Sequence, residues 1–166
     1  SDQPGVYGEQ GVPNEANTPG ARDSATSWID PSGTIWLFGG YFSYLDAKNF
    51  GMLNDLWRYD PASGNCTWMK GSNLPDQPGT YGQLGVADMN NTPGARWGAK
   101  SWTDGSGRLW LFGGYDVNSQ GYMNDLWRYE PTTGMWTWIS GANTAGQAGI
   151  YGTQDVPGAG NTPGSR

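Results

Sequence analysis

Short apolar runs separated by turn residues dominate the chain. The run Ile35-Trp-Leu-Phe38 is apolar at every position, which predicts a strand that is covered on both faces. The segments Asp30-Pro-Ser-Gly33 and Asp60-Pro-Ala-Ser-Gly64 follow apolar runs and supply the residue types that tight turns require. No stretch of the sequence keeps a helical period. The pattern therefore predicts an all-β chain of short antiparallel strands.

The same pattern occurs twice along the chain. Matching segments begin at Asp2 and Asp76, at Trp36 and Trp110, at Asn54 and Asn124, and at Asn17, Asn91 and Asn161. The second copy is shorter between its double glycine and its Asn-Asp-Leu-Trp segment. Internal similarity of this kind indicates a repeat architecture, in which each copy is one structural unit.

Each copy predicts four strands. They cover residues 24–29, 34–38, 55–59 and 67–69 in the first copy, and residues 99–103, 108–112, 125–129 and 136–139 in the second. Large aromatic residues on the third and fourth strands are expected to fill the contacts between the copies. These residues are Trp57, Tyr59, Trp68, Trp127, Tyr129 and Trp138.

One combination of motifs resembles a known family. A double glycine after an apolar strand precedes an Asn-Asp-Leu-Trp-Arg-Tyr strand and then a Trp-bearing strand, and this order resembles the kelch repeat. The connector from Gly-x-Tyr-Gly, where x is any residue, to Asn-Thr-Pro-Gly-Ala-Arg is similar to a bacterial, often secreted, variety of that repeat. The resemblance implies β-propeller blades of four antiparallel strands and an extracellular or cell-surface location. Cys66 departs from the pattern, because the second copy has Trp136 there.

The repeat divides the chain into connectors and two kelch blades. Residues 1–22, 71–96 and 142–166 are the connectors, and residues 23–70 and 97–141 are the blades. A propeller closes with about four to eight blades, so two blades do not close a ring. The expected partners are therefore copies of the chain itself or further blades of the same array, in a closed ring or a filament.

Composition removes several classes of chemistry. The chain contains no His and a single Cys, so it lacks the most common general base and the most common metal ligands. No catalytic, cofactor-binding or metal site is expected. The net charge of −6 disfavours nucleic acid as a partner. No apolar run has the length of a transmembrane helix, so no membrane insertion is expected.

The loops between the second and third strands carry the candidate contact residues. Long loops in compact domains are usually functional or disordered, and these loops differ in length and sequence between the copies. The aromatic residues in or beside them are the candidates for contact with a protein or glycan ligand. They are Tyr41, Phe42, Tyr44, Phe50, Tyr115 and Tyr122.

Repeated charged residues have two interpretations. Arg22, Arg96 and Arg166 either line a binding mouth or pair repeatedly with Asp side chains and carbonyl groups, and the structural interpretation is favoured. Asp55 and Asp125 either form a carboxylate pair or occupy the same structural position in their two copies.

Three functions remain open on the sequence alone. The first is a non-catalytic extracellular binding or assembly module, in which the long loops and connectors form the contact face. The second is a structural subunit of a self-assembling fibre. The third is a segment of a propeller enzyme whose catalytic residues lie outside this chain.

Overall fold

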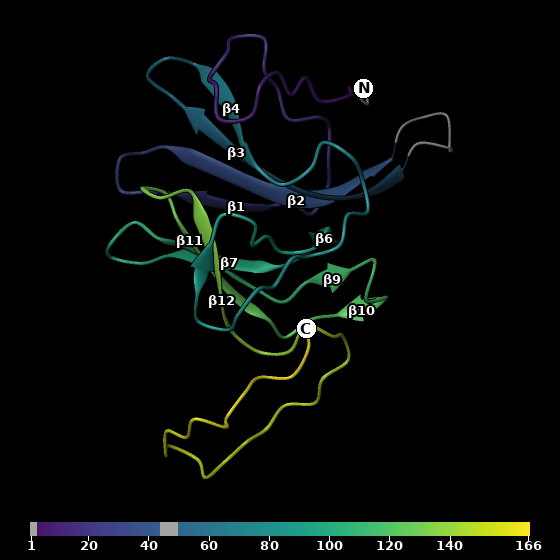
Figure 1. Ribbon diagram of the computed structural model, residues 1–166, viewed down its shortest axis with the longest axis vertical. Coiled ribbons are helices and arrows are strands. Elements are labelled where there is room, and N and C mark those ends of the chain that lie inside the picture. Colours follow the sequence, from purple (N-terminus) through teal and green to yellow (C-terminus); the bar gives the residue numbers. More distant parts are fainter. Residues whose placement is uncertain (1–2, 44–49) are drawn as a thin grey trace.

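The computed structural model describes residues 3–43 and 50–166 (Figure 1). The described residues contain no helix, and their strands form antiparallel sheets, none of which closes into a barrel. The expectation of an all-β chain is therefore confirmed.

The first sheet is built from the first copy of the repeat. Its strands are β1 (Thr26–Ile29), β2 (Ile35–Ser43), β3 (Phe50–Asp60) and β4 (Asn65–Lys70), in the order β1-β2-β3-β4. The turn between β1 and β2 forms because the Asp30 carboxylate accepts hydrogen bonds from the backbone N–H groups of Ser32 and Thr34. Gly33 supplies the positive φ of 84° that closes this turn.

The second sheet is built from the second copy and gains a strand from the connector before it. Its strands are β5 (Ala87–Asp88), β12 (Met135–Ser140), β11 (Leu126–Glu130), β8 (Leu109–Phe112) and β7 (Lys100–Thr103), in that spatial order. In the first sheet, Asn14 makes a single antiparallel bridge to Cys66 at the corresponding edge. The first and second connectors therefore each cover the outer edge of the sheet that follows.

A third, smaller sheet joins the second connector to the loop after β8. It contains β10 (Gly121–Tyr122), β9 (Tyr115–Asp116) and β6 (Arg96–Trp97), in that order. None of these three strands was expected from the sequence, because two-residue strands are too short to show a hydrophobic period.

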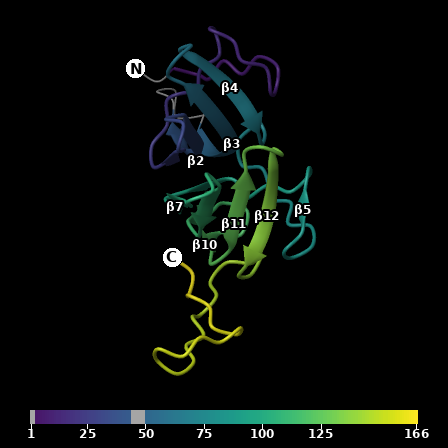
Figure 2. The same ribbon diagram turned by 90° about the vertical axis from the view of Figure 1, so that its left-hand side faces the viewer.

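The apolar core lies between the two main sheets, which stack on one another (Figure 2). Phe38 packs edge-on against Trp136 with ring centroids 5.8 Å apart, and Trp36 packs against Tyr129 at 5.6 Å. The indole N–H of Trp28 donates to the carbonyl oxygen of Trp110 across the same interface, at 2.8 Å. The core of the molecule is thus a contact between repeat copies.

The eight predicted strands are all present in the structure, although several begin or end at other residues. Strands β2 and β3 are longer than expected, since pairing resumes past the double glycine through a register shift between Phe38 and Gly40. Gly39 and Gly40 have φ values of 62° and 100°, which residues with a Cβ rarely adopt. Within the single chain one face of the Ile35–Phe38 run is covered and the other is partly open, because Trp36 is 2% exposed while Ile35 is 39% exposed.

The expectation for the aromatic residues of the third and fourth strands holds only in part. Tyr129 fills the contact between the sheets, but its equivalent Tyr59 is 38% exposed. The rings of Trp68 and Trp138 contact tyrosines of the connectors, Tyr7 at 5.2 Å and Tyr81 at 5.0 Å. The connectors are therefore packed parts of the fold.

Candidate functional site

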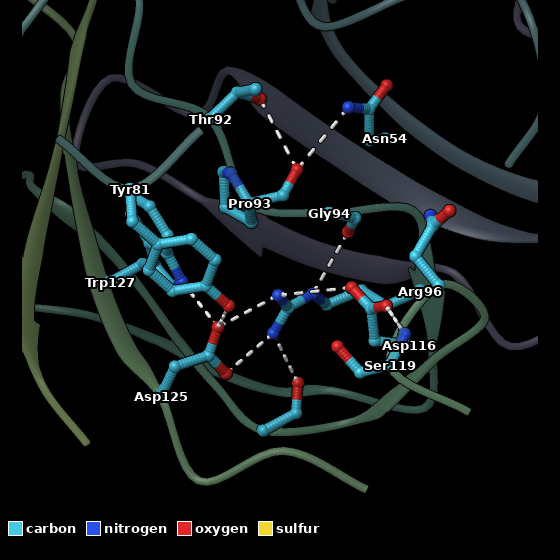
Figure 3. A network of polar contacts seen from close by, with 12 residues as sticks. Asn54, Tyr81, Thr92, Pro93, Gly94, Arg96, Asp116, Ser119, Asp125 and Trp127 are labelled. Carbon is cyan, nitrogen blue, oxygen red and sulfur yellow. Dashed lines mark hydrogen bonds and ion pairs between the residues drawn. The ribbon is translucent and has the colours of Figure 1, made fainter. Parts of the chain in front are cut away.

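The second connector holds the second sheet through a buried ion pair (Figure 3). The side chain of Arg96 is fully buried, and its two terminal nitrogens donate to the two carboxylate oxygens of Asp125 at 2.7 and 2.8 Å. The same guanidinium donates to the carbonyl oxygens of Gly113 and Gly94 at 2.9 and 3.0 Å. This two-point geometry is the strong form of an arginine–carboxylate pair.

Tyr81 and Trp127 complete the coordination of the same carboxylate. The Tyr81 hydroxyl and the Trp127 indole N–H each donate to Asp125 at 2.7 Å. Burial and the negative charge of Asp125 both raise the pKa of Tyr81, so its hydroxyl stays protonated and continues to donate. The buried carboxylate is therefore fully hydrogen-bonded, which offsets the cost of removing it from water.

The first connector repeats this arrangement on the first sheet. Arg22 donates to both oxygens of Asp55 at 2.6 and 2.9 Å, and the hydroxyl of Tyr7 donates to Asp55 at 2.7 Å. The indole N–H of Trp57 donates to the same carboxylate at 2.6 Å. We refer to the connector Tyr and Arg that hold the Asp of a sheet as the Tyr–Arg clamp.

The clamps support the structural interpretation of the repeated charges. Arg22 and Arg96 are paired with Asp side chains and carbonyl groups, so neither is available to line a binding mouth. Asp55 and Asp125 belong to separate clamps and do not form a carboxylate pair.

The C-terminal arm, residues 142–166, has the form of a third clamp. Ile150 and Thr162 make the antiparallel bridge that Thr80 and Thr92 make in the second connector. Yet Tyr151 is 79% exposed, and the arm projects away from both sheets (Figures 1 and 2). A hollow of about 620 Å³ lies along the arm, and its lining includes Ile150, Tyr151, Val156, Asn161, Pro163 and Arg166.

The two main sheets also differ in which face is covered. Trp28 in β1 is 3% exposed because the second sheet covers it, whereas its equivalent in β7, Trp102, is 45% exposed. Trp102 stacks on Trp110 with ring centroids 5.9 Å apart and planes 8° apart, which leaves a flat aromatic surface. The opposite face of the first sheet exposes Ile35 and Tyr59, whose equivalents Leu109 and Tyr129 are completely buried.

The loop aromatics predicted as contact residues lie in different surroundings. Tyr115 and Tyr122 belong to a ring cluster with Trp97, with centroid distances of 5.5 to 6.4 Å. Phe50 is 57% exposed on its strand, while Phe42 is only 9% exposed. Tyr44 lies outside the described residues.

Tyr41 lies beside the ring cluster. Tyr41 and Trp97, with Asp23, Ser24 and Met52, line a hollow of about 320 Å³. Trp97 was not among the residues predicted from the sequence, although one signal was available. It stands where the first copy has Asp23, so it is an aromatic residue specific to one copy of the repeat.

The described part of the chain contains no group of three or more acidic or cysteine side chains arranged to hold a metal ion. Within the same part of the chain, no helix has the length and apolar character needed to cross a membrane.

Comparison with known proteins shows similarity of fold alone. No protein-family model matches the chain, and no curated protein matches it. The solved structure of YjhT is similar to this chain with a TM-score of 0.55 and 16% sequence identity, over 81% of this chain. The chain spans only 42% of the length of that structure. This similarity agrees with a β-rich architecture.

Proposed function

We propose that this chain is a non-catalytic binding or assembly module, located outside the cell or at its surface, whose two main sheets act as blades of the kelch type. The observation that carries the proposal is the difference between equivalent surfaces. Trp28 is buried by a neighbouring sheet, whereas the equivalent Trp102 is exposed because none of the described sheets packs on it.

The physical support is the cost of leaving these faces in water. An exposed aromatic surface next to polar residues is typical of a protein–protein contact, and burial of apolar area is worth about 25 cal/mol per Å². The exposed faces lie on opposite sides of the sheet pair, Trp102 on one side and Ile35 with Tyr59 on the other. Copies would therefore meet head to tail, which produces rings when the rotation closes and filaments when it does not.

The ring cluster of Trp97, Tyr115 and Tyr122, with Tyr41 beside it, is the second contact surface of the proposed module. Rings that are partly exposed and held by their neighbours suit a protein or glycan ligand, because little side-chain freedom is lost on binding.

Sedimentation of the 17.9 kDa chain tests the proposal. Between about 1 and 100 µM we expect the weight-average mass to rise above that of one chain, and Trp102→Glu to lower it again. The control is Leu74→Glu, since Leu74 is similarly exposed, at 59%, but lies outside β7 and β8. A folded chain that remains monomeric throughout this range contradicts the assembly function.

A further inference from the structure

The C-terminal arm and the first connector are near-copies of one another. Residues 3–22 and residues 147–166 begin with Gln, carry a Gly-Val-Tyr-Gly or Gly-Ile-Tyr-Gly segment, and end in Asn-Thr-Pro-Gly followed by Ala-Arg or Ser-Arg. Tyr151, Asn161 and Arg166 therefore stand at the positions of Tyr7, Asn17 and Arg22. The two segments carry the same set of donors for the same type of acceptor.

The contacts of the first connector show which contacts the arm lacks. Asn17 donates through its side chain to the carbonyl oxygens of Val12, at 3.1 Å, and of Cys66 in β4, at 3.2 Å. Asn161 keeps only the first type of bond, to Val156 at 3.4 Å. The arm has thus formed its internal contacts but lacks the counterparts of the bonds that Asn17 and Tyr7 make to the sheet after their connector.

The base of the arm is fixed to the second sheet. The backbone N–H of Arg166 donates to Met123 at 3.0 Å, and the Asn124 side chain donates to the Pro163 carbonyl oxygen at 3.2 Å. In the second connector, Asn54 of the first sheet donates to Pro93 at 3.3 Å in the same way, and that connector clamps the sheet packed against the first. The arm is therefore positioned to clamp a sheet packed on the Trp102 face.

The first sheet is the easier one for an incoming arm to reach. Its own connector, residues 3–22, lies against one sheet, and most of its residues are exposed. The second connector instead runs between the two sheets, where Ala95 and Arg96 are 0% and 1% exposed. Release of residues 3–22 would uncover Asp55 and leave the strand pairing of the first sheet intact.

We propose that copies of this chain assemble by exchange, in which residues 147–166 of one copy displace residues 3–22 of the next and clamp its Asp55. This inference rests on the assembly function proposed above. The exchange replaces one arginine–carboxylate pair by another, so no buried charge is left unpaired. The net gain is burial of the Trp102 face against the Ile35 and Tyr59 face of the second copy.

The exchanged contact is weaker than the contact within the chain. Between the sheets of one chain, Phe38 packs on Trp136 at 5.8 Å, whereas the first sheet offers Cys66 at the position of Trp136. The incoming face therefore meets a smaller side chain. Reversible association that depends on concentration is the expected behaviour.

Two matched substitutions test the exchange. Tyr7→Phe removes the hydrogen bond that holds the first connector on Asp55, and Tyr151→Phe removes the equivalent donor from the arm. Exchange predicts opposite effects: Tyr7→Phe tightens self-association about tenfold, and Tyr151→Phe weakens it about tenfold. Sedimentation equilibrium measures both effects, with Tyr122→Phe, in an exposed ring outside the clamps, as the control.

The outcomes separate this inference from the function on which it rests. If wild-type chains associate and both Tyr variants behave alike, the assembly function stands and exchange is overturned. If wild-type chains never associate, the assembly function fails and exchange fails with it. Arg166→Ala provides a second variant that keeps the fold, because Arg166 is exposed in the single chain. Association as tight as that of the wild type would also overturn exchange.

Discussion

Trp28 and Trp102 occupy the same position in two copies of one repeat, and their surroundings differ completely. Trp28 is 3% exposed under the second sheet, while Trp102 is 45% exposed. Both copies have the sequence of a strand made to be covered, so the difference comes from the presence of a neighbouring sheet. The sequence of a repeat thus specifies an apolar sheet face, and the presence of a neighbouring repeat determines whether that face is buried.

The polar side chains of the connectors also differ in whether they contact a following sheet. Arg96 and Arg22 each hold a carboxylate, and Arg166 holds none among the residues that the structure describes. The Tyr residues follow suit, since Tyr7 and Tyr81 donate to an Asp while Tyr151 is 79% exposed. The arm keeps the bridge between Ile150 and Thr162 although its Tyr and Arg hold no Asp in the described part of the chain. The internal structure of a connector therefore does not depend on binding a carboxylate.

The largest loss of stability is expected from replacing the tryptophans that donate to the clamped Asp side chains. Trp57→Ala and Trp127→Ala should each lower the free energy of unfolding by about 3–5 kcal/mol, since both rings are buried and both bind a buried carboxylate. Trp102→Ala should cost about 1 kcal/mol or less in the single chain. Urea unfolding at low protein concentration measures all three, and costs below about 1 kcal/mol at both clamp positions would show that these rings are not buried.

The next largest loss of stability is expected from replacing the buried arginine of a clamp. Arg96→Ala should cost about 3 kcal/mol, because it leaves the buried Asp125 charge without its cation, although Tyr81 and Trp127 still donate to it. Arg166→Ala should change the free energy of unfolding by less than about 0.5 kcal/mol, because its side chain is exposed. Thermal and urea unfolding of the two variants provide the comparison. Equal costs at the two positions would mean that the arm is already clamped within the chain.

A third comparison concerns the turns before β2 and β8 at acidic pH. The pKa of Asp104 is lowered to about 2, first because the Trp110 indole N–H donates to it, with backbone donors and Arg108 adding to the effect. The pKa of Asp30 is also lowered: burial raises it, but hydrogen bonds from Ser32 and Trp36 outweigh burial. A lowered folded-state pKa gives stability above the unfolded value of about 3.9, and this stability is lost as the pH falls towards 2.

Urea unfolding between about pH 5 and pH 2 should therefore show stability falling as the pH is lowered, and Asp104→Asn should flatten that fall. Asp30→Asn should flatten it less, since the first copy has Thr34 where Arg108 pairs with Asp104 in the second. An unchanged pH profile in Asp104→Asn would exclude this carboxylate as a source of the acid sensitivity.

The smallest effect is expected at Tyr129. Its hydroxyl is buried between the sheets and makes no hydrogen bond with any described residue. Removal of a buried polar atom without a partner costs little, so Tyr129→Phe should be neutral or slightly stabilising in urea unfolding. Tyr59→Phe, in the open face of the first sheet, is the matched control. A clear loss of stability in Tyr129→Phe alone would point to a bound water at that hydroxyl.

Local structure was predictable from the sequence because its causes are local. The eight main strands follow from apolar runs and from the Asp, Pro and Gly residues of the turns. The double glycine was recognised only as part of the kelch-like motif, and the positive φ of Gly39 and Gly40 is a finding of the structure. The lengthening of β2 beyond these glycines was not predictable, because it depends on pairing with a partner strand through Phe42 and Gly51.

The clamps illustrate what the sequence could not establish. The recurrence of Tyr, Arg and Asp was visible, but Arg22 and Asp55 are 33 residues apart, and no local rule joins them. Trp97 was missed because it lies outside the loops between the second and third strands, where the candidate aromatic residues were chosen. The exposure of Trp102 was equally hidden, since its sequence surroundings match those of the buried Trp28.

The connector strands that cover the sheet edges have a further consequence for how this protein can grow. On one side, β5 occupies the edge of β12, and the backbone N–H of Asn14 donates to Cys66 at the edge of β4. On the other side, the hydroxyls of Ser101 and Thr103 donate to carbonyl oxygens of β1. Unpaired strand edges are the usual starting point of amyloid-like aggregation. Because the edges of β12, β4 and β1 are occupied in this way, growth through side-chain faces is favoured, and a polymer of this chain would lack a strand-to-strand ladder at those edges.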